Sequence, residues 1–592
     1  MEPFFESFLD VVEYWSNRLP DKKAYIFLAD GETKEETITY LELKRKVTAF
    51  ATNIQKDTKP DDRVLILNPP GIDFIISFLG CLYAGVIPVP LYPPDKHSLS
   101  RLVSVSLDCD SVLALANSHV ISKFDSYKAL YETSLEEKNQ DKANFFKVVN
   151  RLKLIDSDQL QQDFQNKITI KKPQRDQTAF LQYTSGSTSQ PKGVIVSHYN
   201  LIHNSQIIYK AIKHSPDHCK VSWLPPFHDM GLIAEVLQSL YGGMTLVFMS
   251  PNAFLKRPVR WLKAITAYKH LGPITCGSPN FGYEFCIETV TDEQLEQLDL
   301  SAWKLAYNGA EPVRISTINR FINKFSVCGF KANAFHPVYG LAENTLLVSV
   351  SDLSEPPLIK NFDANLLKIN IAKENNNGQT IPLPSCGNIV EDHKVIIVDP
   401  DENTERSEGN VGEIWIKGGS VAQGYWNNEV ETQRTFHAHL SKTGEGPFMR
   451  TGDLGFIYQN HLYITGRIKD IIIICGQNHY PQDIEITVEE AHEAIRTAGG
   501  GAFSIDRDEN EMLVIVYEIK RKFYKTLNLE DLRTCIRDAV FKKHSLYVYD
   551  IVFIEQSSFP KTTSGKLQRQ LCKKQYLDGS LEIANIEVDT SI

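Results

Sequence analysis

Apolar positions near the N-terminus follow two patterns, one helical and one typical of buried strands. Thr39 and Glu42 have the spacing of a capping box, which marks the start of a helix. One face of that helix would carry Leu43, Val47, Phe50 and Ile54. Short apolar runs at 63–67 and 86–90 predict buried strands, and a helix is expected between them at 73–84. This alternation predicts an α/β protein in which crossover helices join parallel strands.

The same alternation continues through the middle of the chain. The expected elements are a strand at 244–249 and helices at 201–212, 232–240 and 258–267. Two segments, 138–158 and 351–384, are polar and without a clear period, so we expect irregular surface segments there. Open α/β sheets bind ligands outside the carboxyl ends of their strands, and the Gly- and Pro-rich motifs of this chain fall at such positions.

The pattern changes in character near residue 469. After it we expect a helix at 482–495, a helix at 529–543 and strands at 471–474, 512–519 and 547–554. These elements predict a small α+β domain over residues 469–592, which follows a large domain over residues 1–468.

Composition narrows the class of protein. The chain has 592 residues, of which 42% are hydrophobic and 23% charged, as in ordinary globular proteins. A formal net charge of −10 argues against binding to nucleic acid or to an anionic membrane surface. The ten cysteines form no C-x-x-C pair, and the acidic start of the chain is unlike a signal peptide, so a cytoplasmic protein is expected.

One uncharged segment, residues 74–92, is nearly long enough to cross a bilayer. It contains Pro88 and Pro90, which would interrupt helical hydrogen bonding close to its end. We therefore expect a buried helix that leads into a core strand, and no transmembrane segment.

A turn rich in Gly, Ser and Thr lies between apolar runs at 179–181 and 194–196, which predict a hairpin-like connection between two buried strands. Its candidate phosphate-binding residues are Thr184, Ser185, Gly186, Ser187, Thr188 and Lys192. Backbone N–H groups and hydroxyls of such a turn can surround a triphosphate, although the spacing is not that of a Walker loop. On its own the turn is equally compatible with a plain loop.

A second loop of the same composition, residues 560–566, ends at Lys566. An ammonium group in such a loop can stabilise charge that develops on a carboxylate and a phosphate. The two loops together suggest activation of a carboxylate by ATP.

Seven motifs occur in one order along nearly the whole chain. They are residues 183–193, 222–231, 308–312, 339–344, 450–455, 466–470 and 560–566. In this set and order the chain resembles the adenylate-forming ligases. Residues 228–233 and 476–485 are most similar to the fatty acyl-AMP ligases within that superfamily. The resemblance implies a large adenylation domain with mixed sheets and helices, and a small mobile C-terminal domain that turns about a hinge at Lys469.

The resemblance also implies roles for individual residues. Lys566 matches the catalytic lysine, and Thr184 and Glu343 match the residues that hold Mg²⁺. Asp453 would bind the ribose with help from Arg467, and His228 would border the carboxylate end of the acyl site. The expected nucleotide-binding positions are Tyr339, whose ring would face adenine, and Gly309, Ala310, Glu311 and Gly340.

Each of these residues also has an ordinary structural interpretation. A loop lysine is usually exposed, a glutamate at a helix start can be a capping charge, and an aspartate in a Thr-Gly-Asp turn can be a turn residue. Four further residues either line the acyl pocket or belong to the core, namely Gly277, Ser278, Pro279 and Phe281.

The acyl acceptor depends on the segment 351–384. Fatty acyl-AMP ligases carry an insertion in this region, thought to oppose the rotation that thioester formation with CoA needs. The resemblance therefore implies that a fatty acid is activated and passed to an acyl carrier protein supplied as a separate chain. A fatty acyl-CoA ligase and a non-catalytic scaffold that binds adenylate or lipid remain as alternatives.

Overall fold

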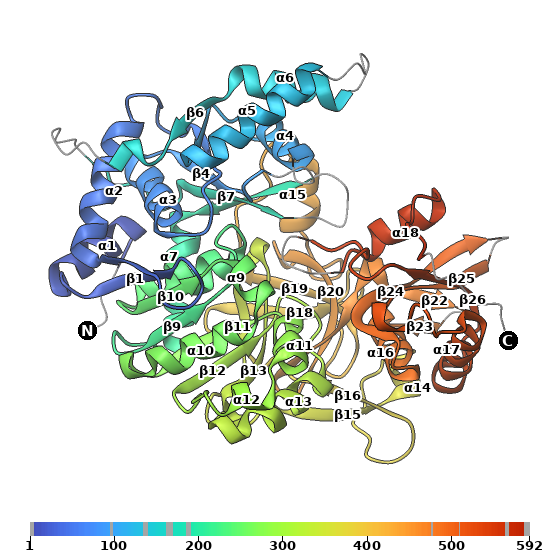
Figure 1. Ribbon diagram of the computed structural model, residues 1–592. Coiled ribbons are helices and arrows are strands. Elements are labelled where there is room, and N and C mark those ends of the chain that lie inside the picture. Colours follow the sequence, from blue (N-terminus) through green and yellow to red (C-terminus); the bar gives the residue numbers. More distant parts are fainter. Residues whose placement is uncertain are drawn as a thin grey trace.

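The structure is a computed structural model that describes residues 5–94, 99–133, 140–161, 170–184, 191–474, 477–507, 510–562 and 567–584. Figure 1 shows a large N-terminal body and a smaller C-terminal lobe beside it. Within the described residues, no helix is long and apolar enough to cross a membrane.

The largest sheet carries the C-terminal strand ends that face the candidate site. Its middle strands, from β13 to β1, are parallel, whereas the strands at both edges run antiparallel. In the described chain its order is β17 (Asn388–Ile389), β14 (Leu347–Val350), β13 (Phe335–Gly340), β12 (Trp303–Asn308), β11 (Ile274–Ser278), β9 (Cys219–Ser222), β10 (Thr245–Met249), β1 (Lys23–Leu28) and β2 (Glu35–Thr39).

Helices accompany this sheet along the chain. They are α7 (His198–Ala211), the π-helix η2 (Met230–Leu237), α8 (Gln238–Tyr241), α9 (Pro251–Lys256), α10 (Val259–Tyr268), α11 (Asn280–Thr289), α12 (Asp292–Leu295) and α13 (Ile315–Phe325). The sequence-based helices at 201–212 and 258–267 and the strand at 244–249 are confirmed. The helix expected at 232–240 is split into η2 and α8, and periodicity alone cannot distinguish a π-helix from an α-helix.

A second sheet is parallel throughout, with the order β4 (Ile87–Pro90), β3 (Arg63–Ile66), β5 (Leu113–Ala116) and β6 (Lys153–Asp156). Its helices are α1 (Phe8–Arg18), α2 (Tyr40–Ile54), α3 (Ile72–Ala84), α4 (Leu99–Asp108), α5 (Ser118–Thr133) and α6 (Gln140–Arg151). The capping box at the start of α2 is present, because Glu42 accepts from the Thr39 amide at 2.9 Å and the Thr39 hydroxyl accepts from the Glu42 amide at 3.2 Å.

The prediction of an irregular segment at 138–158 is wrong. Helix α6 and strand β6 occupy most of it. Phe145 and Val148 are buried, and the Phe145 ring stacks on that of Phe124 with centroids 6.0 Å apart. Phe146 and Val149 are partly buried against the same core, so four apolar residues anchor a helix whose remaining positions are mostly polar. Tertiary packing here decides what the sequence pattern left open.

The expected hairpin is formed by β7 (Thr178–Thr184) and β8 (Lys192–Ser197), which pair antiparallel. The turn between them, residues 185–190, lies outside the described residues, so the candidates Ser185, Gly186, Ser187 and Thr188 are not described.

A further antiparallel sheet carries the motifs around Asp453 and Arg467. Its order is β18 (His393–Val398), β19 (Gly412–Gly418), β20 (Met449–Tyr458) and β21 (His461–Arg467), with α15 (Glu429–Phe436) between β19 and β20 in the chain.

The segment expected to be irregular at 351–384 instead forms a hairpin of β15 (Ile359–Asp363) and β16 (Thr380–Pro384), with the short helix α14 (Ala364–Leu367) between them. Phe362 is fully buried, and its ring lies 4.9 Å from that of Phe456 and 5.3 Å from that of Tyr463, between centroids. Leu367 and Ala372 are buried in the same cluster, so a small apolar core orders a segment whose composition suggested a loop.

The C-terminal lobe has its own core. Its strands are β22 (Ile472–Ile474) paired with β23 (Gln477–His479), and the sheet of β24 (Ile495–Arg507), β25 (Asn510–Ile519) and β26 (Val548–Ile554). Its helices are α16 (Pro481–Ala491), α17 (Leu529–His544) and α18 (Arg569–Leu577). Helix α16 ends four residues before the expected position 495, because His492 has extended backbone angles and β24 begins at Ile495.

Candidate active site

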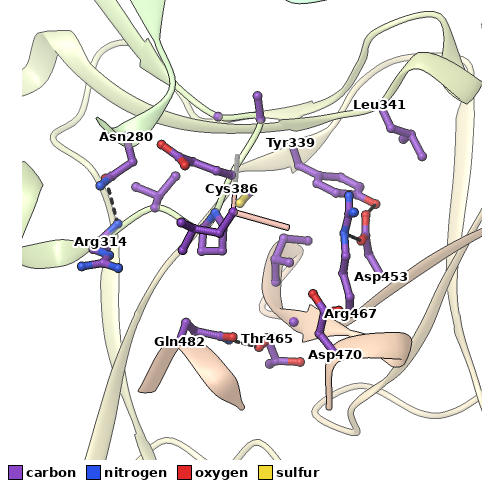
Figure 2. A pocket seen from close by; sticks show the side chains of 18 of the residues that line it. Asn280, Arg314, Tyr339, Leu341, Cys386, Asp453, Thr465, Arg467, Asp470 and Gln482 are labelled. Carbon is purple, nitrogen blue, oxygen red and sulfur yellow. Dashed lines mark hydrogen bonds and ion pairs between the residues drawn. The ribbon is translucent and has the colours of Figure 1, made fainter. Parts of the chain in front are cut away.

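A cleft of about 1760 Å³ lies between the large body and the C-terminal lobe. The carboxyl ends of β12 and β13 open into it, through Gly309–Pro312 and through Tyr339 and Gly340. Parallel sheets place ligands at such strand ends. Figure 2 shows Tyr339, Asp453 and Arg467 on one wall of this cleft, and Thr465, Asp470 and Gln482 nearby.

Asp453 is at the centre of a small polar cluster. The Tyr339 hydroxyl donates to its Oδ2 at 2.7 Å, and Arg467 Nε donates to its Oδ1 at 3.0 Å. Asp453 and Arg467 are opposite each other in the β20–β21 register, which explains their contact. Burial and the Asp453 charge raise the pKa of Tyr339, so the phenol stays a donor. Each carboxylate oxygen keeps a second lone pair that can accept from a ligand hydroxyl.

The loop after β12 approaches its neighbours very closely. Ala310 has a φ of +68°, in the left-handed region. A Cβ on Gly309 would lie 2.8 Å from Val338 Cγ2, and a Cβ on Gly340 would lie 2.2 Å from the Leu346 carbonyl oxygen. Glu311 turns its Oε1 toward the start of α11, where it accepts from the Phe281 amide at 2.6 Å. The expected backbone surface is therefore present, and the Glu311 side chain itself bonds to the protein.

Glu343 and Thr184, the candidate metal-binding pair, both line the cleft. The Tyr425 hydroxyl donates to Glu343 Oε1 at 2.9 Å, and burial raises the pKa of the Glu343 carboxyl. Among the described residues, no group of three or more His, Cys, Asp or Glu side chains could hold a metal ion. One carboxylate and one hydroxyl fit Mg²⁺ only if phosphate oxygens and water complete its shell, which is the usual arrangement for this ion.

Lys192, at the start of β8, forms an ion pair with Glu431 of α15. Its ammonium also lies 4.9 Å from the centre of the Tyr425 ring. Both partners line the cleft. Because Glu431 follows Lys192 by 239 residues, no local pattern could have indicated this contact.

His228 also lines the cleft, directly before the π-helix η2. Its Nδ1 lies 2.7 Å from Asp229 Oδ1, and its side chain is 23% exposed. The prediction that His228 borders the site agrees with this position, whereas its role stays a prediction.

Of residues 277–281, Phe281 lines the cleft, and Asn280, which the prediction did not single out for the acyl pocket, lines it as well. Gly277 and Ser278 belong to the buried strand β11. An apolar arm of the cleft extends between α7, η2 and strands β13 and β14. Its walls include Ile208, Ile212, Ala234, Val338, Leu346 and Val350.

Lys566 lies outside the described residues. On either side of residues 563–566, Thr562 and Leu567 line the cleft. The candidate hinge residue Lys469 lies in a short 3-10 turn at the border between body and lobe, and its carbonyl accepts from Gln570 Nε2 at 2.7 Å.

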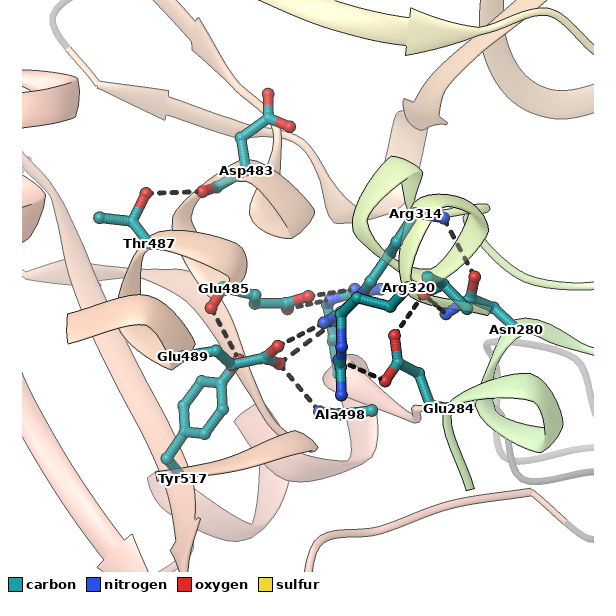
Figure 3. Close-up of polar contacts among 12 residues, drawn as sticks. Asn280, Glu284, Arg314, Arg320, Asp483, Glu485, Thr487, Glu489, Ala498 and Tyr517 are labelled. Carbon is teal, nitrogen blue, oxygen red and sulfur yellow. Dashed lines mark hydrogen bonds and ion pairs between the residues drawn. The ribbon is translucent and has the colours of Figure 1, made fainter. Parts of the chain in front are cut away.

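The two parts of the molecule are joined by a bidentate ion pair between Arg314, which precedes α13, and Glu489 of α16. Figure 3 shows the two side chains facing each other. Arg314 Nη2 lies 3.3 Å from Glu489 Oε1, and Nη1 contacts the other oxygen. Only 11% of the Arg314 side chain and 8% of the Glu489 side chain are exposed. The Arg314 amide donates to Asn280 Oδ1 at 3.1 Å, so this pair is continuous with the wall of the cleft.

One cysteine, Cys386, lines the cleft in the part of the chain that is described, and Figure 2 draws it among the residues that line the cleft. Burial raises the pKa of its thiol to about 12.

Comparisons with known proteins agree with this geometry. The AMP-binding enzyme family matches residues 12–426, and the AMP domain of Disco-interacting protein 2-like proteins matches residues 469–586. A medium-chain-fatty-acid–[acyl-carrier-protein] ligase of Moorena producens is 42% identical over 98% of this chain and 97% of its own. Another ligase of that description, from Teredinibacter turnerae, is 34% identical over 95% of this chain and 92% of its own.

A crystal structure of fatty acyl-adenylate ligase from Legionella pneumophila, in complex with acyl adenylate and pyrophosphate, has a TM-score of 0.73 at 38% identity. The alignment covers 98% of this chain and 97% of that one. The chain therefore belongs to the AMP-binding enzymes of the adenylate-forming superfamily, and among them to the fatty acyl-AMP ligases.

Proposed function

We propose that the protein activates a fatty acid with ATP and transfers the acyl group to the thiol of an acyl carrier protein supplied as a separate chain. In the first step a carboxylate oxygen attacks the α-phosphorus, the bond to the bridging oxygen breaks, and pyrophosphate leaves. No protein nucleophile is required, so the cleft must position two anions and spread their charge. The product is an acyl-adenylate whose leaving group in the second step is AMP.

The observation that carries the first step is the convergence of a ribose-binding cluster and an apolar arm in one cleft. Asp453, held by Tyr339 and Arg467, presents acceptors that suit a ribose diol. Val338 of the apolar arm and Tyr339 of the ribose-binding cluster both belong to β13 and both line the cleft, so this one strand borders both parts of it. A ligand with a nucleotide head and an apolar tail suits this arrangement.

Other residues would take the remaining roles in this proposal. Glu343 and Thr184 would hold Mg²⁺ together with phosphate oxygens, and the ion would supply positive charge to those oxygens. Lys192 would contact the phosphates, and Lys566 would stabilise charge between the carboxylate and the α-phosphate. His228 would position the carboxylate.

Fatty-acid-dependent exchange between labelled pyrophosphate and ATP tests the first step. Exchange that requires a fatty acid, together with acyl-AMP detected by mass spectrometry, is the expected result. No exchange with any fatty acid would instead favour a scaffold that binds adenylate or lipid without catalysis.

The acceptor is proposed from the hairpin insertion. The Asn478 amide donates to the Lys368 carbonyl at 3.2 Å, and Asn478 Nδ2 donates to Asn370 Oδ1 at 3.0 Å. Lys368 and Asn370 lie between β15 and β16, whereas Asn478 lies in β23 of the C-terminal lobe. The insertion therefore bridges the body and the lobe close to Lys469, where it would oppose rotation of the lobe and so disfavour CoA as acceptor.

Removal of this bridge tests the acceptor. The intact protein should accumulate acyl-AMP with CoA and should form a thioester with a phosphopantetheinylated carrier protein. Deletion of residues 359–384 should increase acyl-CoA formation, and Asn478→Ala should do so to a smaller degree. Rapid acyl-CoA formation by the intact protein would favour the acyl-CoA ligase alternative.

A further inference from the structure

A buried pair of opposite charges lies next to the apolar arm, because Lys220 lines the cleft and Glu235 directly follows Ala234 of the arm's wall. Lys220 of β9 and Glu235 of η2 approach each other to 3.3 Å between Nζ and Oε2, and each side chain is 1% exposed. Removing two charges from water costs several kcal/mol per ion unless further hydrogen bonds compensate. A pocket meant only for a hydrocarbon chain would be better lined by apolar side chains, so the pair calls for an explanation.

Glu235 is held firmly from the protein side. The Tyr307 hydroxyl donates to its Oε1, and a backbone hydrogen bond comes from Gly277. A Cβ on Gly277 would lie 2.3 Å from Tyr307 Cδ2, so the glycine lets the tyrosine ring cross β11 to reach the carboxylate. Glu235 is part of the π-helix, a rare conformation that is frequent at functional sites.

Lys220, in contrast, is turned toward the cleft. It lines the cleft together with Tyr307 and with Met230 and Ala234 of η2. Its ammonium lies 5.3 Å from the centre of the Tyr307 ring, and in the described part of the chain its ion-pair partner is Glu235. An ammonium carries three N–H donors, and among the described residues the acceptor group that Lys220 contacts is the Glu235 carboxylate. Donor capacity of the ammonium therefore remains where it lines the cleft, and Glu235 Oε2, which faces it, is itself a buried oxygen without a hydrogen bond among the described residues.

We propose that Lys220, held by Glu235 and Tyr307, forms a polar end wall of the acyl site that recognises an oxygen at the far end of the acyl chain. The ligand class is a neutral acceptor, a hydroxyl or keto group, because the pair is already balanced in charge. This inference rests on the proposed function and specifies its substrate class. A methyl terminus at the same place would leave the buried donor without an acceptor, and a site built to bond a polar group discriminates strongly against the analogue that lacks it.

The test compares matched substrates. A series of saturated fatty acids of increasing length is assayed by pyrophosphate exchange, and at each length the analogue with one hydroxyl on the terminal carbon is assayed alongside. At the length that reaches the end wall, we expect kcat/KM for the hydroxy acid to exceed that of the parent acid by about tenfold or more. A ratio at or below one at every length would overturn the inference.

A double variant provides the second measurement. Lys220→Met with Glu235→Leu removes both charges at similar volume, which avoids leaving one buried ion alone. The double variant should have a higher kcat/KM for the unsubstituted acids than for the hydroxy acids. Tyr307→Phe, which keeps both charges, should still prefer the hydroxy acids, but by a smaller ratio. An unchanged ratio in a folded double variant would contradict the end wall.

The two proposals fail in different ways. If no acid supports exchange, the proposed function fails. If acids of both series are adenylated equally well, the acyl-AMP ligase activity stands and only the end wall is refuted. Thermal unfolding of each variant shows whether it is folded before the ratios are compared.

Discussion

Replacing Arg314 with methionine should separate the C-terminal lobe from the body without damaging either. Arg314 reaches across from the body, whereas Glu489 also accepts from Ala498 N and from the Tyr517 hydroxyl, both at 2.9 Å and both within the lobe. After the substitution Glu489 keeps these two donors. Glu489→Gln is the harsher change, because it weakens contacts inside the lobe and also leaves Arg314 buried opposite a neutral amide.

The expected size follows from burial. Burial alone would lower the pKa of Arg314, but the Glu489 charge outweighs it and the net shift is upward, so the pair is favourable in place. Hydrogen bonds to a charged group contribute about 1.5–3 kcal/mol each, and loss of a buried partner costs about 3–5 kcal/mol. Since Glu489 retains two donors, we expect the lower range, about 1.5–3 kcal/mol, for Arg314→Met. That corresponds to roughly a 10- to 150-fold shift of the docking equilibrium away from the arrangement seen here.

Pyrophosphate exchange at saturating substrate reports this shift, because Thr562 and Leu567, on either side of the segment that contains Lys566, line the cleft in this arrangement. A double-mutant cycle with Glu489→Gln isolates the pair. We expect a coupling energy above about 1 kcal/mol between the two substitutions. The free energy of unfolding of the large body should be the same in Arg314→Met as in the unmodified protein. Strictly additive effects, or full exchange activity in Arg314→Met, would refute the assignment of this pair as one of the contacts that hold the lobe against the body.

Four further substitutions test the cleft. Asp453→Asn should lower kcat/KM for ATP by about 10- to 100-fold through loss of a charged acceptor, and an unchanged KM for ATP would contradict a ribose contact. Glu343→Gln should raise the Mg²⁺ concentration needed for half-maximal exchange, whereas Tyr425→Phe should raise it less; equal Mg²⁺ dependence in all three proteins would argue against a metal role. Burial raises the pKa of Asp483 from 3.8 to about 7, so its contribution to stability is present at low pH and is lost as the pH rises toward 7. The free energy of unfolding of Asp483→Asn minus that of the unmodified protein should therefore increase from about pH 4 to about pH 7 and then level off. Urea titrations at several pH values measure this difference. A difference that does not change with pH would contradict the raised pKa.

Local signals in the sequence were enough for much of the fold. The capping box at Thr39 and Glu42 and the apolar runs of the parallel strands depend on neighbours in the chain, and these were predicted with small errors at the ends. Helix α6 and the hairpin of the insertion were missed because a few apolar residues, such as Phe145 and Val148 in α6 and Phe362 and Leu367 in the insertion, anchor segments whose remaining positions are largely polar. Burial of a single ring depends on the partner surface, which periodicity does not contain.

The residues of the candidate site also fall into two groups, those that the sequence could predict and those that it could not. Its motif residues were found because the order of the motifs matches a superfamily, and the structure brings Tyr339, Asp453 and Arg467 into contact. The ion pair that joins the lobe to the body was not found. Arg314 and Glu489 are 175 positions apart, and their contact follows from how the lobe lies against the body. Such pairs have no signature in a single sequence.

An enzyme that manufactures an acylating agent must itself resist acylation. Within the described part of the chain, Cys386 is the cysteine that faces the compartment where the mixed anhydride would arise. With a pKa of about 12, its sulfur stays protonated at neutral pH and is a poor nucleophile. The acyl-adenylate is therefore not attacked by this cysteine before the thiol of the acyl acceptor reacts with it.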